Sequence, residues 1–275
     1  MAIARPDLGH GIGLRTKHFA QMLVEPPPVD WLEATSENFF VKGGRPLAVL
    51  DKVRRDAPLV LHGVSLCIGS TDSLDDDYLR SLSGLIDRVQ PALVSDHLCW
   101  GRHGGRYAHD LWPLPWTEEA LAHVVARVAE VQERLGRQIA LENVSSYVTF
   151  NDSTMSEWEF LAAVAERADC GILLDINNVF VSAHNHGFDA HEYLKGIPRD
   201  RVVQFHLAGH QDKGEWLLDS HDASVPGRVW SLYRTAVRRF GRTPSLIEWD
   251  DHIPPLEALV AESRKAAAIE REELS

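Results

Sequence analysis

A stretch from residue 138 to residue 178 decides the fold and reads QIALENVSSYVTFNDSTMSEWEFLAAVAERADCGILLDINN. Residues 138–143 and 171–177 are short apolar runs of β type. Residues 156–167, which lie between them, have the apolar periodicity of a helix. A strand, a helix and a second strand in this order predict a βαβ unit of a parallel sheet.

The same alternation continues along the rest of the chain. Further strands are expected at residues 31–35, 59–65, 92–97, 202–207, 216–221 and 245–249, and further helices at 74–89, 117–135, 225–240 and 255–269. Only the link between 207 and 216 is short and lacks a helix signal. Eight strands in about 220 residues fit a closed barrel better than an open sheet. We therefore expect one α/β domain over residues 1–275, a (β/α)₈ TIM barrel, with Gly9–Arg15 as an extra strand or a plug across the barrel bottom.

Histidine, aspartate or glutamate stands where seven consecutive apolar runs stop. These residues are His62, His97, Glu142, Asp175, His206, the pair Asp219 and His221, and Glu248. In a barrel the C-terminal ends of the strands converge on one mouth. One such residue alone is typical of a hydrogen-bonded histidine or of a helix cap. So many buried carboxylates together require a compensating cation, and the pattern predicts a metal site at the mouth.

The types of donor narrow the choice of metal. Imidazole and carboxylate without a nearby thiolate suit Fe, Mn or Zn, and they argue against a structural zinc site. Four histidines and four carboxylates are too many for one ion, so we expect a cluster of two or three ions. Glu142 and Asp175 stand in the middle of the series and are the expected bridges. Asp219 and His221 are two residues apart, so on a strand they would share a face and hold one ion.

Composition limits the partners. The chain has 28 basic and 40 acidic residues and a formal net charge of −12. This balance disfavours a broad surface for nucleic acid or for an anionic membrane. No apolar run reaches the roughly 18–20 residues of a membrane helix, and residues 1–10 lack the apolar core of a signal peptide, so we expect a cytoplasmic location. Cys67, Cys99 and Cys170 are too scattered for a disulfide framework, and we expect them to be small buried hydrophobic residues.

A family resemblance is carried by phrases that span nearly the whole chain. They are GIGLR (11–15), WLEATSENFF (31–40), LHGVSL (61–66), SDHLCW (95–100), HDLWPLPWTEE (109–119), LENVSSYV (141–148), LDINNVFVSAHNHG (174–187), FHLAGH (205–210), DSHD (219–222) and IEWD (247–250). The order of the strand-end residues resembles the xylose-isomerase-like barrels, and among them the trinuclear zinc site of endonuclease IV. The phrases themselves resemble the multinuclear non-haem iron-dependent oxidative enzymes, a family that includes the cysteine-modifying enzyme of methanobactin biosynthesis.

The resemblance implies a cluster of two or three irons in mixed Fe(II)/Fe(III) valence. By resemblance, the first iron would be bound by His62, His97 and Glu142, the second by Glu142, Asp175, His206 and Glu248, and the third by Asp219 and His221. Endonuclease IV has a further histidine three residues after its strand-five aspartate, where this chain has Asn178. The departure implies a weak oxygen ligand and a more labile third ion. His184 is a candidate substitute or substrate-side group, or else a solvated loop residue, and His210 is a candidate ligand or a neighbour of the ligands.

The activity that the resemblance implies is oxidation of a residue, usually cysteine, in a ribosomally made precursor peptide. O₂ would be the co-substrate, and the peptide thiolate would bind one iron. Family members commonly work with a partner protein that recognises the leader of the precursor. No segment of this chain resembles a peptide-recognition domain, so we expect such a partner.

Other polar residues are expected near the mouth. Glu33, Glu37 and Asn38 lie at or after the run 31–35, and they are candidates for contacts with peptide amides or for surface caps. Asp110 and Asn143 are candidates for residues that orient metal-binding histidines.

Three other functions fit parts of the pattern. A phosphoesterase of the endonuclease IV type would use zinc and require a basic groove, against which the net charge and Asn178 argue. A sugar isomerase or epimerase would use one or two divalent ions without O₂. A metal-binding protein without catalytic activity is the last alternative, and an open cluster argues against it.

Overall fold

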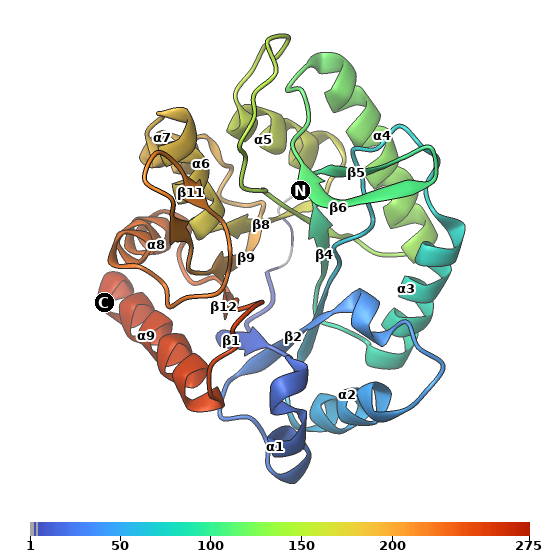
Figure 1. Ribbon diagram of the computed structural model, residues 1–275, viewed down its shortest axis with the longest axis vertical. Helices are drawn as coiled ribbons and strands as arrows, with labels where there is room; N and C mark the ends of the chain where they lie inside the picture. Colours follow the sequence, from blue (N-terminus) through green and yellow to red (C-terminus); the bar gives the residue numbers. More distant parts are fainter. Residues whose placement is uncertain (1–2, 4) are drawn as a thin grey trace.

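Eight parallel strands close into a barrel in the computed structural model, which describes residue 3 and residues 5–275. In order around the barrel they are β1 (His10–Gly13), β2 (Trp31–Thr35), β3 (Leu59–His62), β4 (Val94–His97), β7 (Ala140–Glu142), β8 (Gly171–Asp175), β9 (Val202–Leu207) and β12 (Ser245–Ile247). Figure 1 shows these strands at the centre, with helices around them. The expected TIM barrel is confirmed.

The helices mostly follow the strands, as predicted. They are α1 (Phe19–Val24), α2 (Arg45–Asp56), α3 (Asp76–Val89), α4 (Glu118–Leu135), α5 (Glu157–Arg167), α6 (Ile176–His186), α7 (Ala190–Gly196), α8 (Gly227–Phe240) and α9 (Leu256–Leu274), with short 3₁₀ helices η1 (Thr16–His18) and η2 (Ser36–Phe39). The Thr117 hydroxyl caps α4 by accepting from the Ala120 amide at 3.2 Å. Ser156 and Glu159 form a capping box at the start of α5.

One predicted barrel strand was wrong. Residues 216–221 do not enter the barrel, because only β11 (Leu217–Leu218) is a strand there and it pairs antiparallel with β10 (Gln211–Asp212). The eighth barrel strand is β1, which pairs with both β2 and β12. Its Gly11 has no room for a side chain, since a Cβ there would lie 2.5 Å from the Trp31 ring. Glycines lower strand propensity, so a four-residue strand with two of them gives a weak sequence signal.

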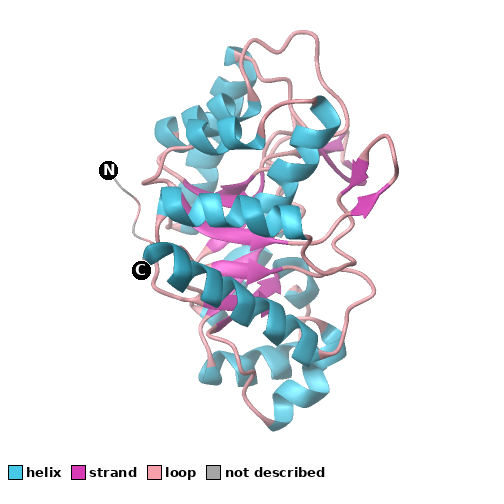
Figure 2. Ribbon diagram, turned by 90° about the vertical axis from the view of Figure 1, so that its left-hand side faces the viewer, coloured by secondary structure: helices cyan, strands magenta, loops and turns pink. Residues whose placement is uncertain are grey.

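The connection between β4 and α4 also differs from a simple turn. It contains an antiparallel hairpin of β5 (Trp100–His103) and β6 (Arg106–Trp112). Figure 2 shows this hairpin at the end of the barrel opposite to the C-terminus. The hairpin therefore stands over the mouth at which the strands end.

The barrel interior is built in two layers. The lower layer is apolar and consists of two small clusters, Trp31, Val60 and Leu246, and Ala140, Leu173 and Val203. Two residues further along the same strands stand Glu33, His62, Glu142, Asp175 and Glu248. Side chains two apart on a strand share a face, so the apolar floor fixes which residues point to the axis above it.

Strand β9 needs an irregularity to join both layers. Val203 packs in the lower layer and His206 lies in the polar layer, three residues apart, which regular alternation forbids. The pairing with β8 shifts register here, from Ile172 opposite Val202 to Leu173 opposite Gln204. The extra residue of this bulge lets Val203 and His206 both face inward.

The main hydrophobic core lies between the barrel and its helices. All three cysteines are buried and free, as expected. Within the described part of the chain, no helix combines the length and the apolar character that crossing a membrane requires.

Candidate metal centre

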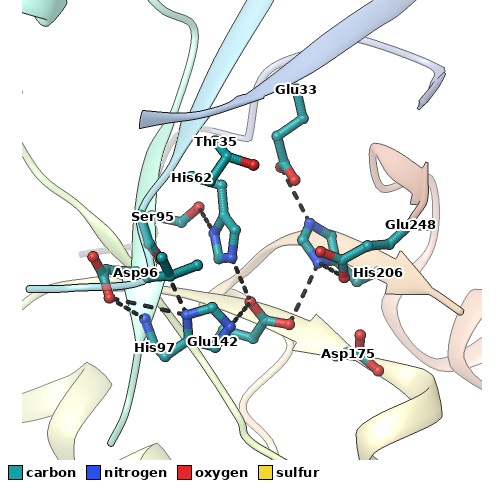
Figure 3. Close-up of polar contacts among 12 residues, drawn as sticks. Glu33, Thr35, His62, Ser95, Asp96, His97, Glu142, Asp175, His206 and Glu248 are labelled. Atoms are coloured by element: carbon teal, nitrogen blue, oxygen red, sulfur yellow. Dashed lines mark hydrogen bonds and ion pairs between the residues drawn. The ribbon is translucent and has the colours of Figure 1, made fainter. Parts of the chain in front are cut away.

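Six of the eight predicted ligands meet at the mouth of the barrel. His62, His97, Glu142 and Asp175 are the last residues of β3, β4, β7 and β8, His206 is the penultimate residue of β9, and Glu248 directly follows β12. All six are nearly or fully buried. Figure 3 shows the Glu142 carboxylate between the two histidines of β3 and β4 on one side and His206 on the other.

The first group consists of His62, His97 and Glu142. Glu142 Oε2 lies 3.1 Å from His62 Nε2 and 3.3 Å from His97 Nε2. The far nitrogens of both rings are held in place, His62 Nδ1 by the Ser95 hydroxyl at 2.9 Å and His97 Nδ1 by the Gly63 carbonyl at 3.1 Å. Both Nε2 atoms are thereby aimed at the same carboxylate oxygen.

The second group shares Glu142 with the first. Glu142, Asp175, His206 and Glu248 each place one donor atom within 4.8 Å of the others. His206 Nδ1 lies 3.4 Å from Glu142 Oε1 and 3.0 Å from Glu248 Oε2. Oε2 of Glu142 therefore faces the first group and Oε1 faces the second, which is the geometry of a bridging carboxylate.

Burial and neighbouring opposite charges shift the pKa values of the cluster residues. Burial disfavours charge on His62, but Glu142 and Glu33 outweigh it and raise the pKa of His62 to about 9. The same competition raises the pKa of His206 well above its usual value. Burial would raise the pKa of Glu142, but the surrounding histidines hold it well below its usual range. At Asp175, burial and the nearby Glu142 carboxylate raise the pKa strongly.

Several buried donor atoms of the cluster lack a hydrogen bond. Among the atoms that the structure describes, His62 Nε2, Glu142 Oε2, Asp175 Oδ2, Asn178 Oδ1 and His221 Nε2 find no hydrogen-bond partner. Buried polar groups are nearly always paired, and the imidazole nitrogens and carboxylate and amide oxygens that converge here are of the kinds that metal ions bind. The residues present therefore fit a metal cluster.

Asp219 and His221 lie on the outer side of the cluster, in the loop after β11. His221 Nε2 is 2.7 Å from Asp219 Oδ1, so the two do converge. The predicted reason was wrong, because they do not alternate along a strand. The backbone of His221 is left-handed, with φ of 47°, and this turn brings its ring back to Asp219. His221 also groups with Glu248 and Asp250 within 4.8 Å.

Two asparagines connect the groups. Asn143 does not contact a histidine as expected; instead its side chain bonds the backbone of Asp175. Asn178 is buried beside the cluster, and its amide donates to the Asn143 carbonyl at 3.0 Å, which leaves the unpartnered Oδ1 as an oxygen donor. The structure thus places Asn178 where a weak oxygen ligand was expected.

The two further histidine candidates lie outside the cluster. His210 reaches it through one residue, since its Nδ1 lies 2.7 Å from Asn177 Oδ1 and Asn177 donates to Asp219 at 2.7 Å. His184 is exposed on α6 and lines a separate surface pocket with Phe180. The structure therefore does not bring His184 to the predicted site.

The expected roles of the acidic residues near the mouth are partly corrected. Glu33 lies inside the barrel, where its Oε2 is 3.1 Å from His206 Nε2, so it supports a histidine and is not available to a peptide. Glu37 uses Oε1 to accept from the amides of Val64 and Ser65, and so holds the loop after β3. Asp110 lies exposed on β6 and bonds the amide of Leu111, not a histidine.

A pocket of about 380 Å³ opens above the cluster. Its lining includes Asn38, an expected substrate contact, together with His62, His97, Asn178, Asp219, His221 and Glu248. Arg15 and Asp250 also line it, and neither was predicted. Arg15 is the last residue of GIGLR (11–15) and Asp250 is the last residue of IEWD (247–250). Their position in these family motifs is the sequence feature that could have identified them as site residues. The candidate metal-binding residues are therefore accessible from this pocket.

The comparison with known sequences identifies the family. The family described as "RiPP precursor modification enzyme MbnB/TglH/ChrH" matches residues 9–271. The chain belongs to this family. Its relatives include a UPF0276 protein of Anaeromyxobacter sp. (strain Fw109-5), which is 67% identical over 98% of this chain and 95% of its own length. A UPF0276 protein of Caulobacter vibrioides (strain NA1000 / CB15N) is 54% identical over 96% of this chain and 95% of its own.

Solved structures support the fold of this MbnB/TglH/ChrH family member. Endonuclease IV from Thermus thermophilus superposes with a TM-score of 0.62 at 15% identity, covering 97% of this chain and 100% of its own. D-psicose 3-epimerase from Clostridium cellulolyticum H10 has a TM-score of 0.62 at 12% identity, covering 97% and 99%. At these identities the likeness shows a TIM barrel and nothing about the reaction. The family itself modifies ribosomally made precursor peptides.

Proposed function

We propose that this protein is an O₂-dependent oxidase with two or three irons, and that it modifies a cysteine of a ribosomally made precursor peptide. The observation that carries the proposal is the position of Glu142. Its two oxygens face two separate groups of buried nitrogen and oxygen donors, His62 with His97, and His206 with Glu248. A shared carboxylate between two such groups supports a multinuclear centre with donors that suit iron.

Iron bound there would supply redox chemistry with O₂ and would lower the pKa of a bound thiol. The residues of the chain do the rest. Glu33 and Ser95 orient His206 and His62 from behind, so that one ring nitrogen of each is left for metal. The apolar layer below the ligands excludes water from the barrel axis. Electrons removed from the cysteine residue would reduce O₂ to water.

The mouth supports a peptide as substrate. The pocket of about 380 Å³ is lined in part by Leu111 of the β5–β6 hairpin, and the exposed Asn38, which also lines it, offers an amide to a peptide backbone. The net charge of −12 argues against a nucleic-acid substrate. We further propose that a separate protein recognises the leader of the precursor and delivers it to this mouth.

Metal analysis with Mössbauer spectroscopy tests the proposal. The protein is purified without oxygen from iron-supplemented cells, and its iron and zinc contents are measured per chain. Two or three irons, with antiferromagnetic coupling between them, are expected, followed by O₂ uptake when a cysteine-containing precursor is added. Stoichiometric zinc that iron does not replace would overturn the proposal and favour a hydrolase or an epimerase.

A further inference from the structure

His221 has a carboxylate at each of its ring nitrogens. Nε2 lies 2.7 Å from Asp219 Oδ1, and Nδ1 lies 3.0 Å from Asp250 Oδ2. A carboxylate accepts hydrogen bonds but does not donate them. The two carboxylates therefore compete for the ring, and the winner decides which nitrogen is left with a lone pair for a metal ion.

Asp250 is held in place by an arginine. Arg15 Nη2 donates to Asp250 Oδ1, the oxygen that does not face His221. The same guanidinium is fixed by two further bonds, from Nε to the Trp249 carbonyl at 3.0 Å and from Nη1 to the Thr35 hydroxyl at 2.9 Å. Asp250 thus has one oxygen for Arg15 and one for the ring.

The arginine also makes the Nδ1 side of the ring unfavourable for a cation. Arg15 Nη2 lies 3.7 Å from Glu248 Oε1, so its positive charge already stands beside the second carboxylate near Nδ1. A divalent ion bound by His221 Nδ1, Glu248 and Asp250 would have to displace this guanidinium or bear its repulsion.

The Nε2 side is prepared for a cation instead. His221 Nε2 approaches Asp219 Oδ1 without the geometry of a hydrogen bond, and Asn178 Oδ1 has no hydrogen-bond partner. All three residues line the pocket above the cluster. The Asn177 side chain donates to Asp219 Oδ1 at 2.7 Å and holds that carboxylate toward the ring. These are three donors of the kind that a metal ion accepts, with no arginine among them.

We infer that Asp250 is a positioning residue for the outer metal ion, an inference that rests on the proposed multinuclear centre. Asp250 accepts a hydrogen bond from His221 Nδ1–H, which leaves the Nε2 lone pair for an ion shared with Asp219. Arg15 fixes Asp250 and keeps it from acting as a ligand. Carboxylate–histidine–metal relays of this kind orient ligands in many metal sites.

The backbone permits a clean test. The amide of Asp250 donates to the His221 carbonyl at 2.8 Å, and the amide of His221 donates to the Gly209 carbonyl at 3.1 Å. Both bonds remain when the Asp250 side chain is changed. A variant of Asp250 therefore alters the contact with the ring and leaves the left-handed turn at His221 anchored.

The experiment measures metal binding without turnover. Co²⁺ is titrated into metal-free wild type, Asp250→Ala, Asp250→Asn and Asp219→Ala, with Asp251→Ala as the control on the exposed neighbour. We expect Asp250→Ala to weaken the outermost ion about tenfold to a hundredfold and to spare the inner ions. Asp250→Asn should retain most of the affinity, because its amide oxygen still accepts from Nδ1, and Asp219→Ala should lose the ion.

The tautomer of His221 gives a second readout. In zinc-loaded protein labelled with ¹⁵N-histidine, long-range ¹H–¹⁵N spectra should show a protonated Nδ1 and a metal-bound Nε2. A metal-bound Nδ1, an outer ion that survives Asp219→Ala, or a wild type without any outer ion would overturn the inference. Both measurements use only zinc or cobalt and no turnover. The result for Asp250 is therefore independent of whether the native metal is iron and whether the reaction is an oxidation.

Discussion

Asn143 holds Asp175 by both of its backbone polar groups. Asn143 Nδ2 donates to the Asp175 carbonyl at 3.0 Å, and Asn143 Oδ1 accepts from the Asp175 amide at 2.9 Å. The amide side chain acts as one further rung between β7 and β8, just where the strands separate. It thereby fixes the backbone from which the Asp175 carboxylate reaches the cluster.

Replacing Asn143 should therefore damage both stability and metal binding. In Asn143→Ala two buried backbone groups of Asp175 lose their partners, which should cost about 2 kcal/mol or more of unfolding free energy. Urea unfolding of the metal-free protein measures the loss, and metal content after dialysis should fall. Asn151→Ala, in the exposed part of the same loop, should change the unfolding free energy by less than about 0.5 kcal/mol. Equal effects of the two substitutions would contradict this role.

Glu142 should be essential for more than one ion site. Glu142→Ala removes the carboxylate that faces both groups, so metal content should drop by at least one ion per chain while the far-UV circular dichroism stays that of a folded barrel. Glu130→Ala, on the exposed face of α4, is the matched control and should keep full metal content. An unchanged number of ions in Glu142→Ala would refute the bridging role.

Glu33 should act on the metal centre through His206. Its carboxylate lies at His206 Nε2, and His206 Nδ1 faces the cluster. Glu33→Gln should therefore weaken metal binding about tenfold to a hundredfold. A competition titration with a chelator measures the affinity, and Glu25→Gln, which is exposed before β2, serves as the control. If Glu33→Gln changed the KM for peptide and left metal affinity intact, Glu33 would be a substrate contact after all.

The metal-free protein should lose stability as the pH rises. The pKa of His62 is about 9 in the folded chain, against an ordinary value of 6.5. A raised pKa means that the folded state binds the proton more tightly, so this stabilisation is complete below pH 6.5 and disappears as the pH approaches 9. Between pH 7 and 8.5 the Tm of metal-free protein should fall by several degrees, as calorimetry would show.

Two comparisons isolate the contribution of His62. The fall in Tm should be smaller in metal-free His62→Asn, which lacks the titrating ring. It should also be smaller in metal-loaded wild type, where metal has replaced the proton. A metal-free wild type whose Tm is constant or rises over this pH range would contradict the assignment.

The outcome for the ligands shows how much a strand pattern can predict. His62, Glu142 and Asp175 each follow an inward apolar residue by two positions, and each is the last residue of its strand. Strand alternation and the parallel direction of the barrel then leave one place for their side chains. For these residues the sequence was sufficient, because local geometry and the barrel mouth determine the position together.

Other features depended on contacts between distant segments. Strand β1 closes the barrel only because Gly11 allows the Trp31 ring to lie against the backbone, which no local propensity reveals. Glu33 was a candidate for a peptide contact or a surface cap, but its side chain points into the barrel, where it meets His206 of β9. The bulge at Val203 is what turns His206 toward the barrel axis.

The outer part of the site shows the same division. The sequence by itself determined a TIM barrel whose strand ends carry histidines and carboxylates, because periodicity and residue chemistry are local properties. Only the tertiary structure decided that Arg15 binds Asp250 and that Asp250 contacts His221. His221 and Asp250 are 29 residues apart in the sequence, and Arg15 lies near the other end of the chain. Their meeting depends on the closure of β12 onto β1, which brings together charges that no spacing in the sequence relates.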